Sequence, residues 1–194
     1  MAETAPCLCH RRYVKTGPVM PGVFHFFYLL LLLLPLYVAA TGTYQEPQEF
    51  IAEVFAGDPP EPSRLWLNAD LKGKVTQVLG HEPGVLRLRY WAKAGRSAWI
   101  LEEIGKERLI TTGIVVNGGR IELIRILIFR ESRGWEVRYP FFTDQFRDAT
   151  LAGDAGLDRP IDGISGATLS VNAVTRLARL ALVLHDEVMK REGQ

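Results

Sequence analysis

Cysteine is nearly absent from this 194-residue chain, and its two copies, Cys7 and Cys9, both lie close to the N-terminus. No disulfide can therefore cross-link the part of the chain that follows them. The pair has only His10 beside it and falls short of the usual four zinc ligands, so we expect no metal site. The stability of the folded part must come from one hydrophobic core, for which a 47% hydrophobic composition is sufficient.

The chain also lacks a marked excess of either positive or negative charge. The formal net charge is +1, and the arginines are scattered among acidic residues instead of forming a stripe. This balance argues against a nucleic-acid-binding surface, and we expect no nucleic acid partner. The sequence contains no internal repeat, which excludes the repeat architectures.

Residues 23–40 lack any charged side chain and are just long enough to cross a bilayer as a helix. Arg11, Arg12 and Lys15 precede this run, and the first charged residues after it are acidic. The positive-inside rule then keeps residues 1–22 in the cytoplasm as an n-region and exports the rest.

Two fates of the apolar run stay open. Pro35 and the small residues around Ala40 are typical of a signal peptide cleaved after Ala40, which would give a periplasmic protein. The long n-region is typical instead of a transmembrane anchor, which would hold the protein at the inner membrane with its domain facing the periplasm or the exterior. A twin-arginine signal at Arg11 and Arg12 is disfavoured by Lys15.

Residues 41–63 are predicted to form a helix and a proline-rich linker. Residues 46–57 have apolar side chains at helical spacing, and residues 58–62 form a stiff spacer with three prolines. A second helix is predicted behind Asp70 and ends at Gly80.

Beyond residue 84 the apolar period changes from helical to alternating, which predicts strands. The predicted strands are residues 85–91, 97–104, 110–116 and 121–129, with 135–139 as a candidate fifth. Asn117, Gly118 and Gly119 predict a tight hairpin turn, Pro140 opens a short helix, and residues 170–191 form a long final helix. We expect an α+β domain over residues 64–194, with an antiparallel sheet of four to five strands and flanking helices.

The segment Asp162-Gly163-Ile164-Ser165-Gly166-Ala167-Thr168 places a hydroxyl just after a flexible turn, where a helix begins. Gly166 allows the main chain to approach a ligand closely, and free N–H groups at the helix start favour phosphate. The plain alternative is a loop in which Ser or Thr caps the helix.

This segment resembles the flavinylation motif of FMN-binding domains similar to the flavoprotein subunits of sodium-pumping NADH:quinone reductase and Rnf complexes. In that family a flavin transferase joins FMN, through its phosphate, to the hydroxyl of the last Thr, which corresponds to Thr168. The resemblance implies that Ser165, Gly166 and Ala167 surround the phosphate. Asp162 would cap the turn or be recognised by the transferase.

Two weaker similarities extend the resemblance over about residues 71–184. Residues 131–134, Glu-Ser-Arg-Gly, are similar to a Glu-Thr-Pro-Gly segment of the family, with Arg133 where proline is usual. Residues 144–146 are similar to its Gln-Phe segment. The resemblance places near the isoalloxazine ring Glu131, Ser132, Gly134 and Gln145, with Trp135 as a candidate for stacking on it.

These observations predict an exported, membrane-tethered electron carrier that holds FMN covalently on Thr168 and connects membrane redox proteins. We expect a stand-alone family member without sodium transport and with no catalytic residue, because the sequence shows no acid–base pair. Two alternatives stay open: an FMN-dependent oxidoreductase acting on a small extracytoplasmic acceptor, and a non-redox envelope module. The sequence specifies neither the donor, the acceptor, the redox potential nor the oligomeric state.

Overall fold

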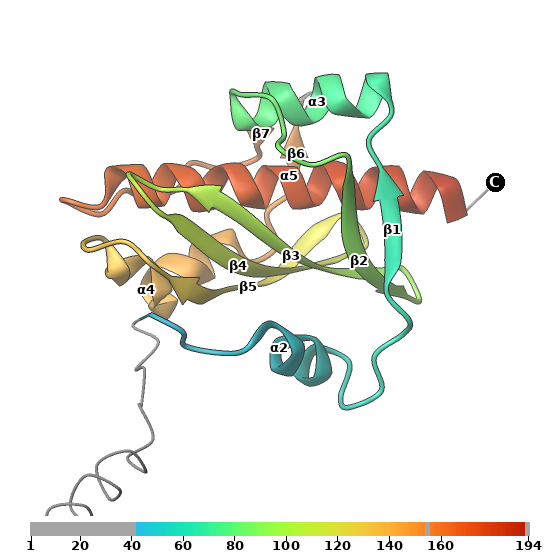
Figure 1. The fold of residues 1–194 in the computed structure, drawn as a ribbon, viewed down its shortest axis with the longest axis horizontal. Coiled ribbons are helices and arrows are strands. Elements are labelled where there is room, and N and C mark those ends of the chain that lie inside the picture. The colour runs from blue at the N-terminus through green and yellow to red at the C-terminus, as the bar shows by residue number, and fades with distance from the viewer. Residues whose placement is uncertain (1–41, 154–155, 193–194) are drawn as a thin grey trace, which may run out of the picture. The chain divides into compact units, whose positions relative to one another are not determined.

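Five antiparallel strands form the central sheet, in the order β1-β2-β3-β4-β5 (Figure 1). The structure is a computed structural model and describes residues 42–153 and 156–192. The strands are β1 (Ser63–Trp66), β2 (Arg87–Lys93), β3 (Arg96–Ile104), β4 (Leu109–Asn117) and β5 (Arg120–Phe129). A separate two-stranded ribbon pairs β6 (Leu151–Ala152) with β7 (Gly156–Leu157). The predicted α+β class and the antiparallel sheet are confirmed.

The predicted apolar run, residues 23–40, and both cysteines lie outside the described residues. Within residues 42–153 and 156–192, no helix has the length and apolarity needed to cross a bilayer.

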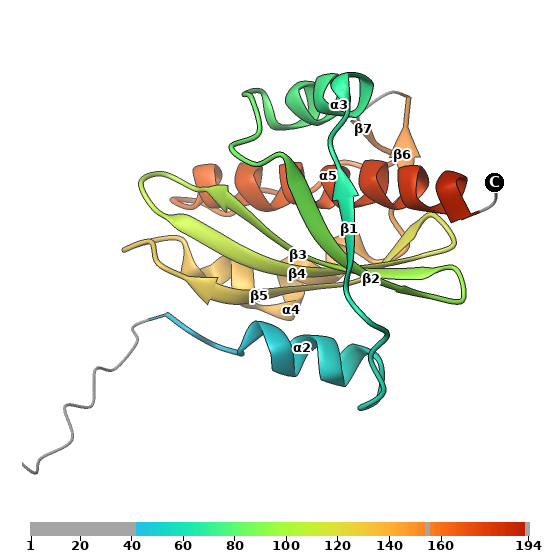
Figure 2. The ribbon, with the colours of Figure 1, turned by 45° about the vertical axis from the view of Figure 1, so that its right-hand side comes forward.

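Helices cover both faces of the sheet (Figure 2). The long helix α5 (Thr168–Glu192) packs on one face, and α3 (Ala69–Leu79) packs against α5. The short helix α2 (Pro47–Val54) packs on the other face. Because side chains alternate along a strand, neighbouring residues of β4 belong to different cores: Ile114 lies in the α5 core and Val115 in the α2 core. The sheet therefore separates two hydrophobic cores, where the sequence predicts one.

The ends of two elements differ from the prediction by one or two residues. The side chain of Asn68 caps α3 by accepting a hydrogen bond from the Leu71 N–H at 2.9 Å, so the cap is not Asp70. In the β4–β5 hairpin, Asn117 still pairs with Arg120. The turn residues with positive φ are therefore Gly118 and Gly119, at +55° and +76°.

The predicted strand over residues 135–139 is wrong. This segment forms a 3-10 helix, η1 (Trp135–Arg138), followed by α4 (Pro140–Thr143) and η2 (Asp144–Phe146). Gly134, with φ of +84°, turns the chain away from the sheet directly after β5, and Pro140 starts the next helix. The fifth strand is instead β1, which is too short and too exposed to show an alternating pattern.

A buried histidine connects α5 to the β4–β5 hairpin. His185 is 2% exposed, and its Nε2 accepts a hydrogen bond from the Gly119 N–H at 3.2 Å. The proton therefore resides on Nδ1, which lies 2.7 Å from Ser97 Oγ and donates to it. Burial lowers the pKa of His185, because the charged ring would be poorly solvated and would lose the Gly119 bond.

We expect His185 to make the fold less stable in mild acid. Its folded pKa lies below the unfolded value, so the unfolded state binds more protons as pH falls from about 7 to about 5.5. The free energy of unfolding, measured in urea across this range, should fall with pH. His185→Gln should flatten that slope, although it should also lower stability at neutral pH. If the free energy of unfolding of the variant fell just as steeply with pH, the pH dependence would come from other titratable groups.

Candidate functional site

The start of α5 lies directly behind a tight turn. The Ala167 N–H donates to the Ile164 carbonyl at 3.0 Å, and Gly166, the third residue of the turn, has φ of +80°. A type II turn requires such a positive φ at that position. Helix α5 then begins at Thr168, two residues earlier than the sequence predicts.

Three N–H groups at the start of α5 have no acceptor within the helix. The first intrahelical bond runs from the Val171 N–H to the Ala167 carbonyl at 3.0 Å, which places Ala167 at the cap position. The N–H groups of Thr168, Leu169 and Ser170 precede that bond. Alanine has no side-chain acceptor that could cap them, so these donors are available to an anion.

Thr168 is exposed and makes no hydrogen bond to another described residue. It is the first helical residue and not the cap, so capping does not explain its hydroxyl. Ser165, in the turn, is exposed as well.

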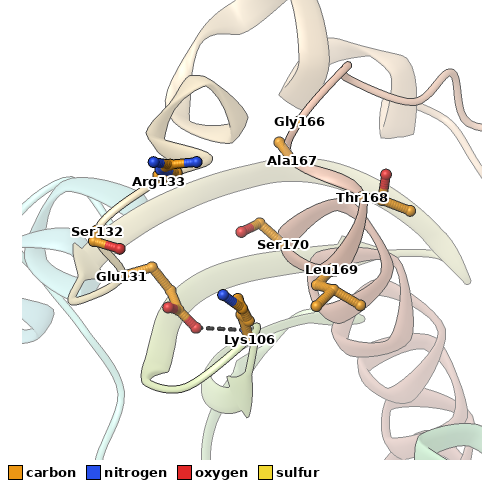
Figure 3. A pocket seen from close by; sticks show the side chains of 9 residues that line it. All are labelled: Lys106, Glu131, Ser132, Arg133, Gly166, Ala167, Thr168, Leu169 and Ser170. Carbon is orange, nitrogen blue, oxygen red and sulfur yellow. Dashed lines mark hydrogen bonds between the residues drawn. The ribbon is translucent and has the colours of Figure 1, made fainter.

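A pocket of about 510 Å³ opens at this helix start (Figure 3). Three segments contribute to it: the turn between β3 and β4, the chain after β5, and the first turn of α5. Figure 3 shows Thr168 across the pocket from Glu131, with its hydroxyl not directed at Glu131. The lining residues are Lys106, Glu131, Ser132, Arg133, Gly166, Ala167, Thr168, Leu169 and Ser170.

Glu131 holds the β3–β4 turn beside this pocket through hydrogen bonds. Its Oε1 accepts hydrogen bonds from the backbone N–H groups of Lys106, Glu107 and Arg108, at 2.5, 2.7 and 2.9 Å. Partial burial alone would raise the pKa of Glu131, but these bonds outweigh it and hold the pKa below its usual value. The ionised carboxylate therefore positions Lys106 at the pocket.

A second pocket, of about 540 Å³, adjoins the first and shares Glu131 and Ser132 with it. Its aromatic lining comes from Tyr44, Phe129 and Trp135, and Trp135 is 42% exposed. The remaining lining residues are Gly42, Glu107, Arg108 and Arg130.

Asp162 and Gln145 lie outside both linings but contact each other. The Asp162 N–H donates to Gln145 Oε1 at 2.7 Å, so η2 holds the chain that leads into the turn. The structure thus brings five predicted residues around the first pocket and Trp135 around the second. Ser165, Asp162 and Gln145 flank the first pocket in sequence or through this bond.

Gly134 lies where the chain after β5 meets α5. It is buried, and a Cβ added to it would lie 2.8 Å from Ser170 Oγ and 3.3 Å from the Ala167 Cβ. Two of the three segments that build the pocket, the chain after β5 and the start of α5, are therefore in direct contact at this glycine.

We expect Gly134→Ala to destabilise the fold by about 1–3 kcal/mol, because alanine is strained at positive φ and its methyl group would displace Ser170. Gly163→Ala is the matched control: no atom lies within 4 Å of its added Cβ, and we expect a change within about 0.5 kcal/mol. Urea unfolding measures both. Equal effects would show that the contact at Gly134 can relax.

Sequence reasoning missed Lys106, Leu169 and Ser170 as residues of the first pocket, and it treated Arg133 only as a departure from a motif. Arg133, Leu169 and Ser170 adjoin the motifs and could have been included. Lys106 had no signal of its own, because only folding brings its turn to Glu131. Among the described residues, no group of three or more His, Cys, Asp or Glu side chains is arranged to hold a metal ion.

Comparison with known proteins gives one family match. The profile of the FMN-binding domain family matches residues 105–183. This range runs from the β3–β4 turn into α5 and includes all three segments that build the first pocket. The search of curated proteins gives no match.

Proposed function

Because residues 105–183 belong to the FMN-binding domain family, we propose that this chain carries FMN covalently on Thr168 and transfers electrons between membrane redox proteins. The family itself is consistent with a flavin-carrying electron-transfer domain. The covalent bond, the location and the partners go beyond the family match and are part of the proposal.

The observation that carries the proposal is the exposed Thr168 hydroxyl at an uncapped helix start. The free N–H groups of the first turn would donate to phosphate oxygens, and the helix start contributes several tenths to about 1 kcal/mol for one negative charge. Lys106 and Arg133, in the same lining, would add positive charge. The residues present therefore fit a phosphate group.

The surroundings of Thr168 also suit the action of a flavin transferase. Gly166 and Ala167 have no bulky side chains, so an enzyme can approach the hydroxyl. The new bond would join Thr168 Oγ1 to the flavin phosphorus. The Oγ1–H bond would break with loss of the proton to a base, and the leaving group would be a nucleotide brought by the transferase with the flavin. The exposed Asp162 remains accessible for recognition.

We propose that the second pocket holds the isoalloxazine ring. Trp135 and Tyr44 offer aromatic surface to a planar ring, and Ser132 offers a hydroxyl. Bound FMN would supply one- or two-electron redox chemistry, while the protein residues bind it, orient it and limit its contact with water.

Export and tethering by residues 23–40 complete the proposal. A flavin transferase would be the maturation partner, and the inner membrane or the periplasm would be the location. A covalent link is useful there, because a dissociated cofactor would be lost by dilution.

The test is the mass of the intact chain produced together with a flavin transferase. We expect the mass to rise by one FMN residue, and we expect fragmentation to assign the addition to the peptide that contains Thr168. Unchanged mass and no flavin fluorescence after denaturation would contradict the proposal and favour a non-redox module. Steady reduction of a soluble acceptor by the loaded protein, given an electron donor, would favour the reductase alternative.

A further inference from the structure

We propose that one exposed aromatic surface of the domain lies against the lipid headgroups of the membrane. This aromatic surface consists of Tyr44, Trp135, Arg138, Tyr139 and Phe141. Tyr44 and Trp135 also line the second pocket, so a bound flavin ring would cover part of them. Tyr139 and Phe141 lie outside both pocket linings and would stay open to lipid. The inference rests on the proposed membrane anchor but not on the flavin bond.

The aromatic surface is assembled around one arginine. The Arg138 guanidinium lies 4.5 Å from the ring centroid of Tyr44, 5.0 Å from that of Trp135 and 4.9 Å from that of Tyr139. The Trp135 and Tyr139 rings meet edge to face at 5.6 Å. These cation–π and ring contacts hold the side chains in place although they are not buried.

The four aromatic side chains are open to solvent in the domain alone. Tyr44 is 40% exposed, Trp135 42%, Tyr139 37% and Phe141 61%. Tryptophan and tyrosine favour the bilayer interface, where the ring lies among apolar atoms and the polar group reaches water. Grouped exposed aromatic residues of this kind mark an interaction surface.

Tyr44 is fixed to the sheet and does not trail from it. Its N–H donates to the Leu127 carbonyl at 2.8 Å, and the Phe129 N–H donates to the Gly42 carbonyl at 2.7 Å. The chain that leads to the predicted apolar run therefore leaves the domain at the aromatic surface.

Chain length restricts how far this surface can be from the bilayer. The predicted run ends at Ala40, and the four residues from there to Tyr44 span at most about 14 Å when fully extended. The headgroup layer itself is roughly 5 to 7 Å thick on each side of the hydrocarbon. With a bilayer span that ends at Ala40, as the sequence predicts, Tyr44 would lie in the headgroup layer or close above it.

Charged side chains of both signs surround the aromatic surface. The acidic ones are Glu107 and Glu131 in the second pocket and Glu136 in η1, and the basic ones that anionic lipid would meet are Arg138 and Arg133. Arg138 donates to the Tyr139 hydroxyl at 3.1 Å, and neither Arg138 nor Arg133 forms an ion pair with a carboxylate of the described residues. Each basic side chain held near an anionic leaflet strengthens attraction to it. This charge, together with the short distance to Ala40, favours lipid over a protein partner as the occupant.

The test uses the full chain with Cys7 and Cys9 replaced by serine and one new cysteine for a fluorescent label. Phe141→Cys places the label on the aromatic surface. The control is Leu86→Cys, at a side chain that is 72% exposed in the loop between α3 and β2, which Figure 1 draws at the top, away from α4. Both proteins are reconstituted into vesicles that contain anionic lipid and a lipid with a nitroxide near its headgroup.

We expect the nitroxide lipid to quench the label at residue 141 several-fold more strongly than the label at residue 86. Arg138→Gln should reduce the difference, and Arg138→Lys should retain more of it. Equal quenching at both positions, or none at either, would overturn the inference. A label at residue 141 that is shielded from a water-soluble quencher but not quenched by the lipid would indicate a protein partner and would also overturn it.

The intact mass of the reconstituted protein separates this inference from the proposed function. A mass that lacks residues 1–40, together with protein released from the vesicles, would overturn membrane contact while leaving flavin attachment intact. A chain that retains these residues but carries no flavin would contradict only the proposed cofactor, and the quenching result would still decide the inference.

Discussion

Thr168→Val is expected to abolish covalent flavin, whereas Thr175→Val should leave loading unchanged. The first substitution removes the only hydroxyl that the proposed bond can use, and valine keeps the shape of threonine. The second makes the same change two turns along α5, at a part-buried side chain whose hydroxyl donates to the Val171 carbonyl at 2.8 Å. Intact mass and flavin fluorescence after denaturation measure both variants.

The fold should be unaffected by the loss of this hydroxyl. Thr168 is exposed and has no hydrogen bond to another described residue, so we expect its substitution to change stability by no more than about 0.5 kcal/mol. Thr168→Ser, which retains a hydroxyl, should recover at least part of the loading. If Thr168→Val still carried a full complement of covalent flavin, the bond would have to be on another hydroxyl, of which Ser165 is the nearest candidate in the motif.

Phe50→Ala is expected to cost about 3–5 kcal/mol of folding stability, the largest stability effect that we predict. Phe50 is fully buried and fixes α2 to the sheet. Its ring lies over Gly113 of β4, where an added Cβ would come within 2.6 Å of the ring. Truncation to alanine would leave a cavity between α2 and the sheet.

Phe141→Ala is the matched control for this experiment. It removes the same side chain at a position that is 61% exposed, and we expect the free energy of unfolding to change by no more than about 0.5 kcal/mol. Urea titrations compare the two variants. A loss below about 1 kcal/mol for Phe50→Ala would show that α2 contributes little to the fold, although it covers one face of the sheet.

The elements with a clear period were predicted well, because period depends only on which side chains face a core. β3, β4, β5 and the long helix fall within one or two residues of their predicted bounds. The period misled at residues 135–139, where alternating Trp, Glu, Val, Arg and Tyr imitate a strand. There, Gly134 and Pro140 at the two ends determine the local structure.

The candidate site was predictable only as far as local sequence defines it. Thr168 could be identified because the Ser-Gly-Ala turn and the helix that follows lie next to each other in the chain. Lys106 could not, because its place at the pocket depends on a carboxylate 25 residues away, Glu131. The aromatic surface likewise joins Tyr44 to residues more than ninety positions later, a proximity that no motif records.

The carboxylate of Glu131 connects the two pockets of the proposed flavin site. Glu131 holds the β3–β4 turn, whose residues line both pockets. The phosphate end and the ring end of a bound flavin would therefore both depend on the position of this one turn. A substitution or a protonation at Glu131 would shift Lys106 on one side and Arg108 on the other. A change at Glu131 would therefore alter both the binding of the phosphate and the surroundings of the ring.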